Sequence, residues 1–579
     1  MHSSITKIAN KIYICSLVIM ASIGIALKRD DGYDFFWYLG AGNLMHGSKQ
    51  LAEPFTAQGL PWHNHEWLFH WIIGLSPQPS LFHLLLKIIF ITAIILIIYF
   101  FNLKRYPEKY YWALFISILA GIFSSEFFAL RAQLGSYFLF MLTWFILTSA
   151  LSETKKAVLL APVMLIWANI HGAFVMGIAL VFYHQFFLFV QSRLKKEKIH
   201  YVSWIPIFVV ILFPLINPYG LEVYVYPLKW VGNEIYKDYI REWTSVIRWP
   251  SLFYPYLIFA IIALFLIIIG KPIKLLEFIP FVIFMILPLT AVRHLPFFYM
   301  FSTLLITESI KNIIKQTHTR KIDLFIFKDW IWGIIIIIAF CFYIILQPRS
   351  VRSADPVFQK YAFPTGAIAF MEDNNLNGRL LNAYQWGGYL WWKGYDIFID
   401  GRLDTLYPES VFRDFTDIVT TKSNWKDILN KWQISLVLYD TRLKNQTPKF
   451  NDALMKDNDW MILYQDPVAT LFARKESLDP DFLFKYKTGA LPIPDEPMCQ
   501  YAAGMTLLHR DGSASEIKRY LKRAIELDPV FAQPHVGLAR VLIKEKKYSD
   551  ALIEIKRAEK LGLRGAELDD LREIASQNQ

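Results

Sequence analysis

The sequence predicts a polytopic α-helical membrane protein that carries a small α/β domain and a C-terminal segment of helical repeats. Three observations support this fold class. The 579 residues are 55% hydrophobic and 16% aromatic, with a mean hydropathy of +0.32, which is too apolar for a soluble protein. About eleven apolar runs occupy residues 1–348. After them the sequence first becomes mixed and then becomes charged and rich in alanine.

Charge and cysteine content exclude two other classes. The formal charge of +11 is typical of basic cytoplasmic loops, and no basic motif indicates nucleic-acid binding. Two of the three cysteines, Cys15 and Cys341, lie in apolar runs. Neither a disulfide framework nor a cysteine-based metal site is therefore indicated.

Each apolar run is expected to form a helix, because a single segment inside a bilayer has no other way to pair its backbone groups. The expected spans are, roughly, 12–27, 81–102, 111–130, 134–151, 157–172, 173–190, 203–216, 253–270, 276–291, 295–309 and 330–347. The first span has no small-residue cleavage site, which indicates a retained signal-anchor.

Basic residues predict the orientation of these spans. With the N-terminus inside, the cytoplasmic segments hold about twice as many Lys and Arg residues as the opposite segments. This bias predicts a multi-pass protein of the inner (cytoplasmic) membrane, with everything after about residue 348 outside the cytoplasm. The expected parts are a membrane domain over 1–348 with an outer loop at 28–80 that holds two interfacial helices, an extracytoplasmic α/β domain over 349–475, a linker over 476–497 and helical repeats over 498–579.

Polar residues near the ends of the spans fall on the predicted outer side. They are Asp34, His65 and Glu66 in the first loop, then Arg131, Gln133, Asn169, His171, Asn217, Glu242, Arg293 and His294. Ionisable groups at membrane depth are costly and usually face a cavity or a partner. One shared side therefore predicts one polar cavity that opens outward and binds substrate.

Each of these residues also has a purely structural explanation. Asp34 is suited to cap an interfacial helix over 34–47, and Glu66 to open a second one. Asn169 and His171 are equally suited to hydrogen bonding between helices. Arg131 is also typical of a loop or a snorkelling side chain.

The segments "DGYDFFWYLGAGNLMHG", "PWHNHEWL", "RAQLGSY", "WANIHGAF", "NPYG", "REW" and "RHLP" are similar to those of a set of bacterial GT-C-like membrane proteins with C-terminal soluble or tetratricopeptide parts. The order of a short anchor, a long outer loop that begins with an acidic residue, and many spans resembles the GT-C superfamily. These are polytopic glycosyltransferases that use polyprenyl-phosphate-linked sugars. The resemblance covers about residues 12–347 and implies that Asp34 is the catalytic carboxylate. Many lipid-sugar transferases carry Lys-Pro-Pro or His-Pro-Pro where this chain has "NHEWL".

The residue types suit this chemistry. A carboxylate such as Asp34 accepts the proton of an attacking hydroxyl group, and Glu66 or His65 is placed to assist it. The departing polyprenyl phosphate develops negative charge, which arginine or histidine side chains stabilise. The candidates for this contact are Arg131, Arg293 and His294.

Metal use is left open by the sequence. Asp34 and Glu66 supply the oxygen ligands that Mg²⁺ or Mn²⁺ prefers. No tight ligand motif such as HExxH accompanies them, and His63 and His65 are two residues apart, which on a helix directs them to different faces. A divalent cation is therefore a hypothesis that only the geometry can support.

The region 349–475 predicts a small α/β domain. "GRLLNAY", "DIFIDGR", "ISLVLYD", "WMILYQD" and "ATLFARK" are typical of strands, and 357–375 and 422–432 of helices. The segment 382–404 is dense in Trp, Tyr and Gly, which indicates either a turn with buried aromatic residues or a binding surface. In favour of a binding surface, segment 382–404 faintly resembles the Trp-rich acceptor-recognition stretch of oligosaccharyltransferase catalytic subunits. That resemblance implies contacts to a sugar or peptide from Trp386, Tyr389, Asp400 and Arg402.

Residues 498–579 resemble tetratricopeptide repeats. Ala524 and Pro529 close one unit, and the packing positions of the next unit are Ala539, Tyr548, Ala551 and Ala558. Such repeats stack into a concave surface, which predicts an extracytoplasmic protein partner. A packing appendage is the alternative. Four prolines mark the linker before the repeats: Pro480, Pro492, Pro494 and Pro497.

Together these features predict an integral membrane glycosyltransferase that transfers a sugar from a polyprenyl-phosphate donor to a glycan, lipid or protein acceptor on the extracytoplasmic face. The first alternative is a non-catalytic scaffold that organises envelope partners through its C-terminal parts. The second is a transporter or flippase, which an inverted internal repeat or a pair of broken spans would favour; the sequence shows neither.

Overall fold

A computed structural model divides the chain into two compact units, which we describe separately. It describes residues 2–27, 33–48, 53–196, 204–229, 240–271, 274–317, 334–335, 338, 360–443 and 448–578. The first unit comprises Met1–Asp30 and Asn64–Leu346, and the second comprises Asp31–His63 and Gln347–Gln579. The predicted outer loop is thus shared, since residues 31–63 fold with the second unit and residues 64–80 with the first.

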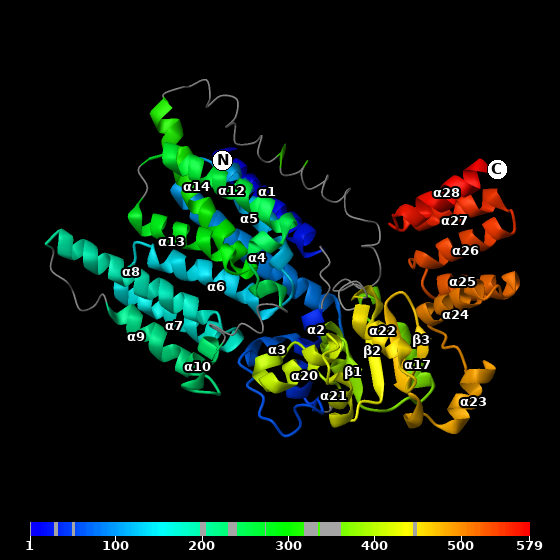
Figure 1. Ribbon diagram of the computed structural model, residues 1–579. Helices are drawn as coiled ribbons and strands as arrows, with labels where there is room; N and C mark the ends of the chain where they lie inside the picture. Colours follow the sequence, from blue (N-terminus) through cyan, green and yellow to red (C-terminus); the bar gives the residue numbers. More distant parts are fainter. Residues whose placement is uncertain are drawn as a thin grey trace. The chain divides into compact units, whose positions relative to one another are not determined.

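The described elements of the first unit are helices (Figure 1). The α-helices are α1 (His2–Ala26), α3 (Trp67–Ile73), α4 (Leu81–Arg105), α5 (Tyr110–Ser124), α6 (Ala132–Leu147), α7 (Glu153–Ile170), α8 (Phe174–Leu194), α9 (Ile205–Leu212), α10 (Glu222–Lys229), α12 (Pro250–Ile269), α13 (Leu275–Ile286) and α14 (Leu295–Thr317). The 3₁₀ helices are η1 (Ser125–Phe127), η3 (Phe213–Leu215), η4 (Arg241–Trp243), η5 (Val246–Arg248), η6 (Leu287–Leu289) and η7 (Val292–His294). Each apolar run predicted between residues 12 and 309 coincides with one of these helices. The span predicted at 330–347 lies, apart from residues 334, 335 and 338, outside the described residues.

Several helices of the first unit have the length and composition to cross a membrane. In the described part of the chain, four qualify on both counts: Leu81–Arg105, Tyr110–Phe127, Phe174–Leu194 and Pro250–Ile269. Shorter apolar helices occur at Ile12–Ala26, Ala132–Leu147, Ile205–Leu215 and Leu275–Leu289. The figure of about eleven crossings stays a prediction.

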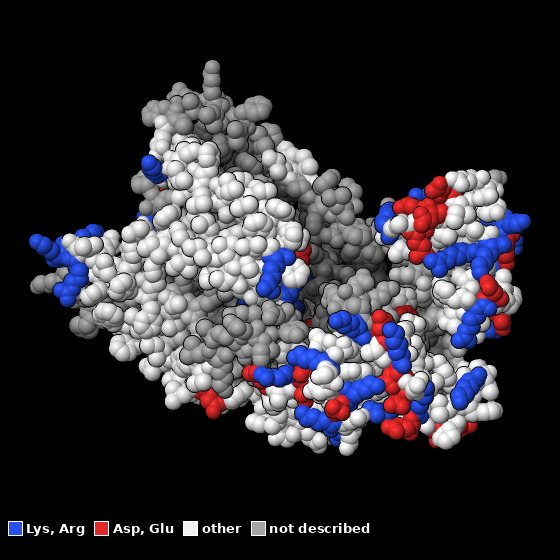
Figure 2. All heavy atoms as spheres, in the orientation of Figure 1, with Lys and Arg blue, Asp and Glu red and all other residues white. Residues whose placement is uncertain are grey.

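The outer surface of these helices is apolar. On α12, Phe265 is 61% exposed and Ile268 is 64% exposed, and on α8 Phe186 is 63% exposed. Figure 2 shows few charged side chains over the face of this unit that is in view. Patches of this kind are unfavourable in water and suit a lipid environment. The unit is therefore a helical bundle with the surface of a membrane-embedded protein.

The interior of the bundle is tied together by polar side chains. Helix α4 packs against α1, α5, α6 and α14. The buried Asn102 amide nitrogen on α4 donates to its own helix, at the Ile98 carbonyl (3.0 Å), and to hydroxyl oxygens of two neighbours, Ser117 on α5 (3.4 Å) and Thr303 on α14 (3.3 Å). Small polar residues of this kind join helices closely where the hydrophobic effect between them is weak.

The second unit is built around a four-stranded mixed sheet of order β1-β2-β4-β3. Its strands are β1 (Leu380–Asn382), β2 (Leu436–Asp440), β3 (Trp460–Gln465) and β4 (Ala469–Arg474). Strands β1 and β2 are parallel and the other pairs are antiparallel, with Val437 opposite both Leu381 and Phe472. The helices of this domain are α2 (Tyr33–Met45), α17 (Thr365–Asp373), α18 (Gly387–Lys393), α19 (Leu403–Leu406), α20 (Glu409–Val419), α21 (Trp425–Lys431) and α22 (Pro448–Lys456), with 3₁₀ helices η9 (Lys360–Ala362), η10 (Tyr384–Trp386), η11 (Thr441–Leu443) and η12 (Lys475–Ser477).

The prediction of a strand at "DIFIDGR" is wrong. Only one isolated bridge forms there, between Ile397 and Leu380. The buried side chain of Asn382 replaces the strand ladder: its Oδ1 accepts from the backbone N–H groups of Phe398 (2.9 Å) and Ile399 (3.4 Å). Its Nδ2 donates to the carbonyl of Ile399 (2.8 Å). Because a side chain takes these backbone groups, the segment runs beside β1 without continuous pairing.

The segment 33–63 is an integral part of this domain. Phe36 on α2 is fully buried. The centroid of its ring lies 4.9 Å from the ring centroid of Phe363 and 4.7 Å from that of Tyr389. Further along, the Thr56 hydroxyl donates to the Phe398 carbonyl (2.5 Å), and the Trp62 indole N–H donates to the Thr405 hydroxyl (3.2 Å). This part of the predicted first loop therefore shares the core of the C-terminal α/β domain.

The chain ends in a set of helices, which Figure 1 shows in orange and red: α24 (Pro497–His509), α25 (Ala514–Leu527), α26 (Gln533–Lys544), α27 (Tyr548–Lys560) and α28 (Ala566–Gln577). The small residues predicted to pack here are buried: Ala524, Ala539, Ala551 and Ala558 are each 0% exposed. Figure 2 shows charges of both signs on their surface. The linker 476–497 itself contains a helix, α23 (Pro480–Thr488), and Pro497 is the first residue of α24.

We predict that Asn382→Ala destabilises the α/β domain by about 2–4 kcal/mol. The substitution removes a buried amide and leaves the Phe398 N–H without a partner, which costs more than the net value of a hydrogen bond. Protease susceptibility of the purified full-length protein under increasing denaturant measures this change. The matched control is Asn377→Ala, whose side chain is exposed; an equal loss in both variants would contradict the role of Asn382.

We predict that the stability of the α/β domain depends on pH because of Asp466, which lies in the turn between β3 and β4. Burial raises the pKa of its carboxyl group to about 6, although N–H groups of Val468 and Ala469 (both 2.7 Å) bind one oxygen. The folded state then holds a proton that the unfolded state, with an ordinary pKa of 3.8, has lost. The free energy of unfolding should therefore fall by up to about 3 kcal/mol as the pH rises from 4 to 6.

Asp466→Asn should flatten this pH dependence, since an amide mimics the protonated acid. Thermal unfolding of the full-length protein between pH 4 and pH 7 measures the effect, with the exposed Asp452→Asn as control. Wild-type stability that rises over this pH interval would show that the carboxyl group is not held protonated.

Candidate functional site

A buried carboxylate surrounded by imidazole rings lies at one end of the helical bundle. Glu66 immediately precedes α3 and is 5% exposed, and its side chain makes no capping hydrogen bond to that helix. Its Oε1 lies 3.6 Å from Nε2 of His171 and 3.8 Å from Nε2 of His65, and its Oε2 lies 3.9 Å from Nε2 of His70. The structure thus brings together two predicted residues, Glu66 and His65, with a third from a distant segment, His171.

The orientation of His171 is fixed by hydrogen bonds at its other ring nitrogen. The Ser136 hydroxyl oxygen accepts from the Trp167 indole (2.7 Å) and lies 2.8 Å from His171 Nδ1. Since Ser136 already accepts from Trp167, its own hydrogen is free to go to Nδ1, and the Ala173 N–H (3.4 Å) also points there. Nδ1 is then an acceptor, and the hydrogen of a neutral ring sits on Nε2, which faces Glu66.

Two predicted residues nearby have structural roles. The Asn169 amide nitrogen donates to the carbonyls of Leu165 (2.7 Å) and Ile216 (3.0 Å), and its oxygen accepts from the Trp67 indole (2.7 Å). Asn217 donates to the Ala168 carbonyl (3.4 Å). These bonds tie α3, α7 and η3 together, which is the helix-joining alternative that the sequence left open for Asn169.

A group of arginines lies near this cluster in the same unit. Arg131, which precedes α6, forms an ion pair with Glu242 in η4. Arg293 in η7 stacks over the Trp243 ring at 4.2 Å and is in no ion pair among the described residues. Burial works to raise the pKa of Glu242, but the charges of Arg131 and Arg293 outweigh it and hold the pKa below its ordinary value.

The sequence predicts that His294, beside Arg293, stabilises the negative charge of a phosphate. The structure places its ring in surroundings that disfavour a positive charge on it. Burial, with a smaller contribution from Arg293, lowers its pKa to about 4, so the ring is neutral near pH 7. Its Nδ1 and the Oε1 of Gln133 are buried and have no hydrogen-bond partner among the described residues. Both atoms can therefore meet polar groups of a bound molecule.

The first turns of α6 connect the two groups. Arg131 precedes the helix and pairs with Glu242, whereas Ser136 supports His171 from the following turn. Arg293 is close enough to both Glu242 and His171 to interact with them electrostatically. We call the set Glu66, His65, His70, His171, Arg131, Gln133, Glu242, Arg293 and His294 the polar cluster.

Asp34 belongs to the second unit, where it lies in the first turn of α2. Its side chain is half-buried. A Cβ atom at Gly401 would lie only 2.9 Å from Asp34 Oδ1 and 2.9 Å from Trp37 Nε1, so a larger residue at 401 would force these side chains to shift. An acidic residue in a first helical turn also interacts favourably with the helix dipole.

Trp386 and Tyr389, which the sequence offered as substrate contacts, are buried in the α/β domain. Trp386 is 0% exposed and donates from its indole to the Ala362 carbonyl (2.9 Å), and Tyr389 packs against Phe36 and Phe363. Arg402 forms a fully buried pair with Asp400 (2.6 Å) and lies 3.6 Å from the centre of the Trp391 ring. These side chains hold the fold together, because none of them reaches solvent.

Sequence analysis missed one residue of the polar cluster, His70, and two residues that support it, Ser136 and Trp167. His70 follows Glu66 by four residues on a helix, a spacing that "HEWLFH" displays and that places both side chains on one face. Ser136 and Trp167 carried no such signal. Among the described residues, no group of three or more His, Cys, Asp and Glu side chains has the arrangement of a metal site.

Comparisons with known proteins assign no family to this chain. No protein-family model matches it, and no curated protein matches it in sequence. What the structure defines is a predominantly helical protein with several helices suited to a bilayer, joined to an α/β domain and a helical C-terminal segment. Any finer class rests on the chemistry of the polar cluster.

We predict that Glu242→Gln lowers the free energy of unfolding by about 1–3 kcal/mol, because it leaves the partly buried Arg131 without its counter-charge. Because the pKa of Glu242 is lowered from its ordinary value of 4.5, the ionised carboxylate contributes its full share to the free energy of unfolding above pH 4.5. This share is lost as the pH falls below 4.5 and the carboxylate takes up a proton. The difference between the two proteins should therefore shrink in acid. Thermal unfolding of the purified protein at several pH values measures this.

The control is Glu409→Gln, which removes the same charge from an exposed pair with Arg413 and should change stability by less than about 0.5 kcal/mol. Equal effects of the two substitutions would show that Arg131 and Glu242 are no more than a surface pair.

Proposed function

We propose that this protein is a GT-C-like glycosyltransferase of the inner membrane, which transfers a sugar from a polyprenyl-phosphate-linked donor to an envelope acceptor on the extracytoplasmic face. The observation that carries the proposal is the polar cluster: a carboxylate among imidazoles, beside arginines, at one end of an apolar helical bundle. Buried ionisable groups of this kind are costly and are usually kept for function.

Glu66 is suited to act as the base in this reaction. A glycosyl acceptor must lose a hydroxyl proton as it attacks, and a buried carboxylate beside imidazoles accepts such a proton without contact with bulk water. His171, held by Ser136, directs its Nε2 at Glu66 and stabilises the charge of the carboxylate. His65, whose side chain is 16% exposed and lies 3.8 Å from Glu66, offers a route by which the proton can leave.

Arg293 is suited to bind the phosphate of the donor. The leaving polyprenyl phosphate gains negative charge, and a guanidinium group binds it through two parallel hydrogen bonds. Arg131 is already compensated by Glu242, whereas Arg293 is held by stacking on Trp243 and pairs with no carboxylate in the described residues. A phosphate there would add negative charge that Glu242, one carboxylate between two guanidinium groups, does not fully supply.

The catalytic carboxylate has two candidates. The resemblance to the GT-C superfamily favours Asp34, and the geometry of the helical unit favours Glu66. The scaffold alternative requires neither. Three substitutions, each of which replaces a carboxylate by an amide of nearly the same shape, therefore separate the hypotheses. They are Glu66→Gln, Asp34→Asn and, as a control, Glu108→Gln at an exposed position between α4 and α5.

We predict that Glu66→Gln abolishes transfer without lowering the amount of protein in the membrane. Mass spectrometry of lipid-linked intermediates from cells with and without the gene first identifies the sugar donor that accumulates. Cells with Glu66→Gln should accumulate it at least tenfold over wild type, and cells with Glu108→Gln should not. If Asp34→Asn behaves like the control, Glu66 alone is the base; if both site variants behave like wild type, the scaffold alternative is correct.

A further inference from the structure

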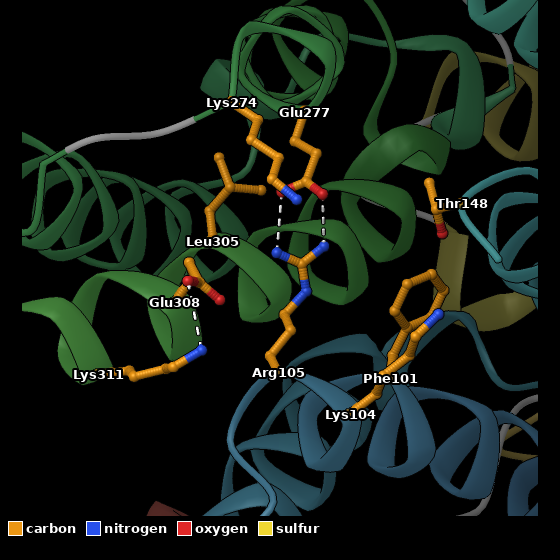
Figure 3. Close-up of a pocket in the computed structure, with 9 residues that line it drawn as sticks. All are labelled: Phe101, Lys104, Arg105, Thr148, Lys274, Glu277, Leu305, Glu308 and Lys311. Atoms are coloured by element: carbon orange, nitrogen blue, oxygen red, sulfur yellow. Dashed lines mark hydrogen bonds and ion pairs between the residues drawn. The ribbon is translucent and has the colours of Figure 1, made fainter. Parts of the chain in front are cut away.

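A cavity of about 290 Å³ lies in the first unit, away from the polar cluster (Figure 3). Phe101, Lys104 and Arg105 reach it from the last turns of α4, and Thr148 from the residue after α6. Lys274 and Glu277 reach it from the start of α13. Leu305 reaches it from the middle of α14, and Glu308 and Lys311 from the later turns of that helix.

The cavity and the polar cluster are at opposite ends of the same helices. Arg131 precedes α6 and Thr148 follows it, and the 16 residues between them span about 24 Å at 1.5 Å per residue. Likewise, Arg293 and His294 precede α14, whereas Glu308 and Lys311 follow from its later turns. The cavity is therefore a separate site, and its role does not depend on the proposed transferase activity.

Positive charge predominates in the cavity. Four cationic side chains and two carboxylates line it, and the carboxylates are both engaged. Glu277 accepts two parallel hydrogen bonds from Arg105 (2.7 and 2.8 Å), and Glu308 lies 3.6 Å from Lys311 Nζ, as Figure 3 shows. Lys104 and Lys274 take part in no ion pair among the described residues.

A further polar group here lacks a partner. The Nε of Arg105 is buried and has no hydrogen-bond partner in the part of the chain that the structure describes. The guanidinium group is held in place by Glu277 and by the Phe101 ring, 5.9 Å away. A cation fixed in this way, next to two lysines with no counter-ion, is arranged to receive an anion with several acceptor oxygens.

We propose that this cavity binds a phosphate group. Lys104 and Lys274 supply the charge that a phosphate needs, and Arg105, held in place by Glu277, lines the same cavity. Phe101 and Leu305 add an apolar wall, and α4 is among the most apolar helices of the chain. Basic pockets between membrane helices bind phospholipid head groups in this way, so a phosphate carried on a lipid fits the cavity better than a free anion.

Binding to the purified full-length protein tests this proposal. After delipidation in a neutral detergent, phosphatidylglycerol, phosphatidylcholine and inorganic phosphate are titrated separately, with native mass spectrometry for the lipids and thermal stabilisation for phosphate. The test variant is Lys104→Gln/Lys274→Gln, which leaves the Arg105–Glu277 pair intact. The matched control is Lys155→Gln/Lys195→Gln, which removes the same charge from exposed positions on α7 and after α8.

Phosphatidylglycerol should bind the wild type and the control equally and the test variant at least about tenfold more weakly, a factor that corresponds to the loss of one charge-assisted hydrogen bond. Lys274→Arg keeps the charge and should retain binding. The same loss with inorganic phosphate but no binding of lipid would keep the site and assign it to a soluble anion. If the test variant and the control bind phosphatidylglycerol equally and also bind inorganic phosphate equally, the proposal is overturned.

Discussion

The helical unit depends on one constraint. Polar groups inside an apolar bundle must form hydrogen bonds with other groups of the protein, because neither lipid nor a closely packed interior provides water to pair with them. The amide nitrogen of Asn102 meets this constraint by joining α4 to α5 and α14, and the side chain of Asn169 meets it by joining α3 and α7 to η3. Ser136 meets it by linking Trp167 to His171. The bundle is therefore fixed by side-chain hydrogen bonds as well as by packing, and these bonds also set the orientation of the residues around Glu66.

Some buried polar atoms of the described residues have no such partner, and three of them lie at the two sites described above. Among the described residues, buried polar atoms without a partner include Gln133 Oε1, His294 Nδ1 and Arg105 Nε. The first two belong to the polar cluster and the third to the cationic cavity. The two ends of α6 and α14 thus carry different chemistry: imidazole groups occur with carboxylates and arginines at one end, and lysines occur with an arginine and two carboxylates at the other. An arrangement of this kind suits a protein that meets different ligands at its two ends.

The helices of the first unit could be predicted from sequence because apolar runs of sufficient length leave the backbone few alternatives. Four of the five strands predicted in the α/β domain are also present. The fifth, at 396–402, failed because the Asn382 side chain occupies the backbone groups that a strand would have used. Local composition does not reveal such a competition, since it depends on one side chain in another part of the sequence.

The candidate site could be predicted as a set of residues but not as a set of pairs. Hydropathy placed Glu66, His171, Arg131 and Arg293 on one side, and the structure brings them into the same end of the bundle. That Glu242 pairs with Arg131, 111 residues away, or that Ser136 orients His171, depends on tertiary packing. For Trp386 and Tyr389, aromatic density was compatible with either a core or a binding surface; both side chains are buried in the structure, and substrate contact by them stays a prediction.

The packing of segment 33–63 into the α/β domain has a consequence for any topology in which the helical unit crosses a bilayer. Thr56 and Phe398, 342 residues apart, are joined by a hydrogen bond, so they occupy the same aqueous compartment. A polypeptide that leaves this compartment after residue 63 and is back in it by residue 360 must traverse the bilayer an even number of times. Parity alone therefore rules out every odd count of crossings between these two points, whichever of the short helices are counted.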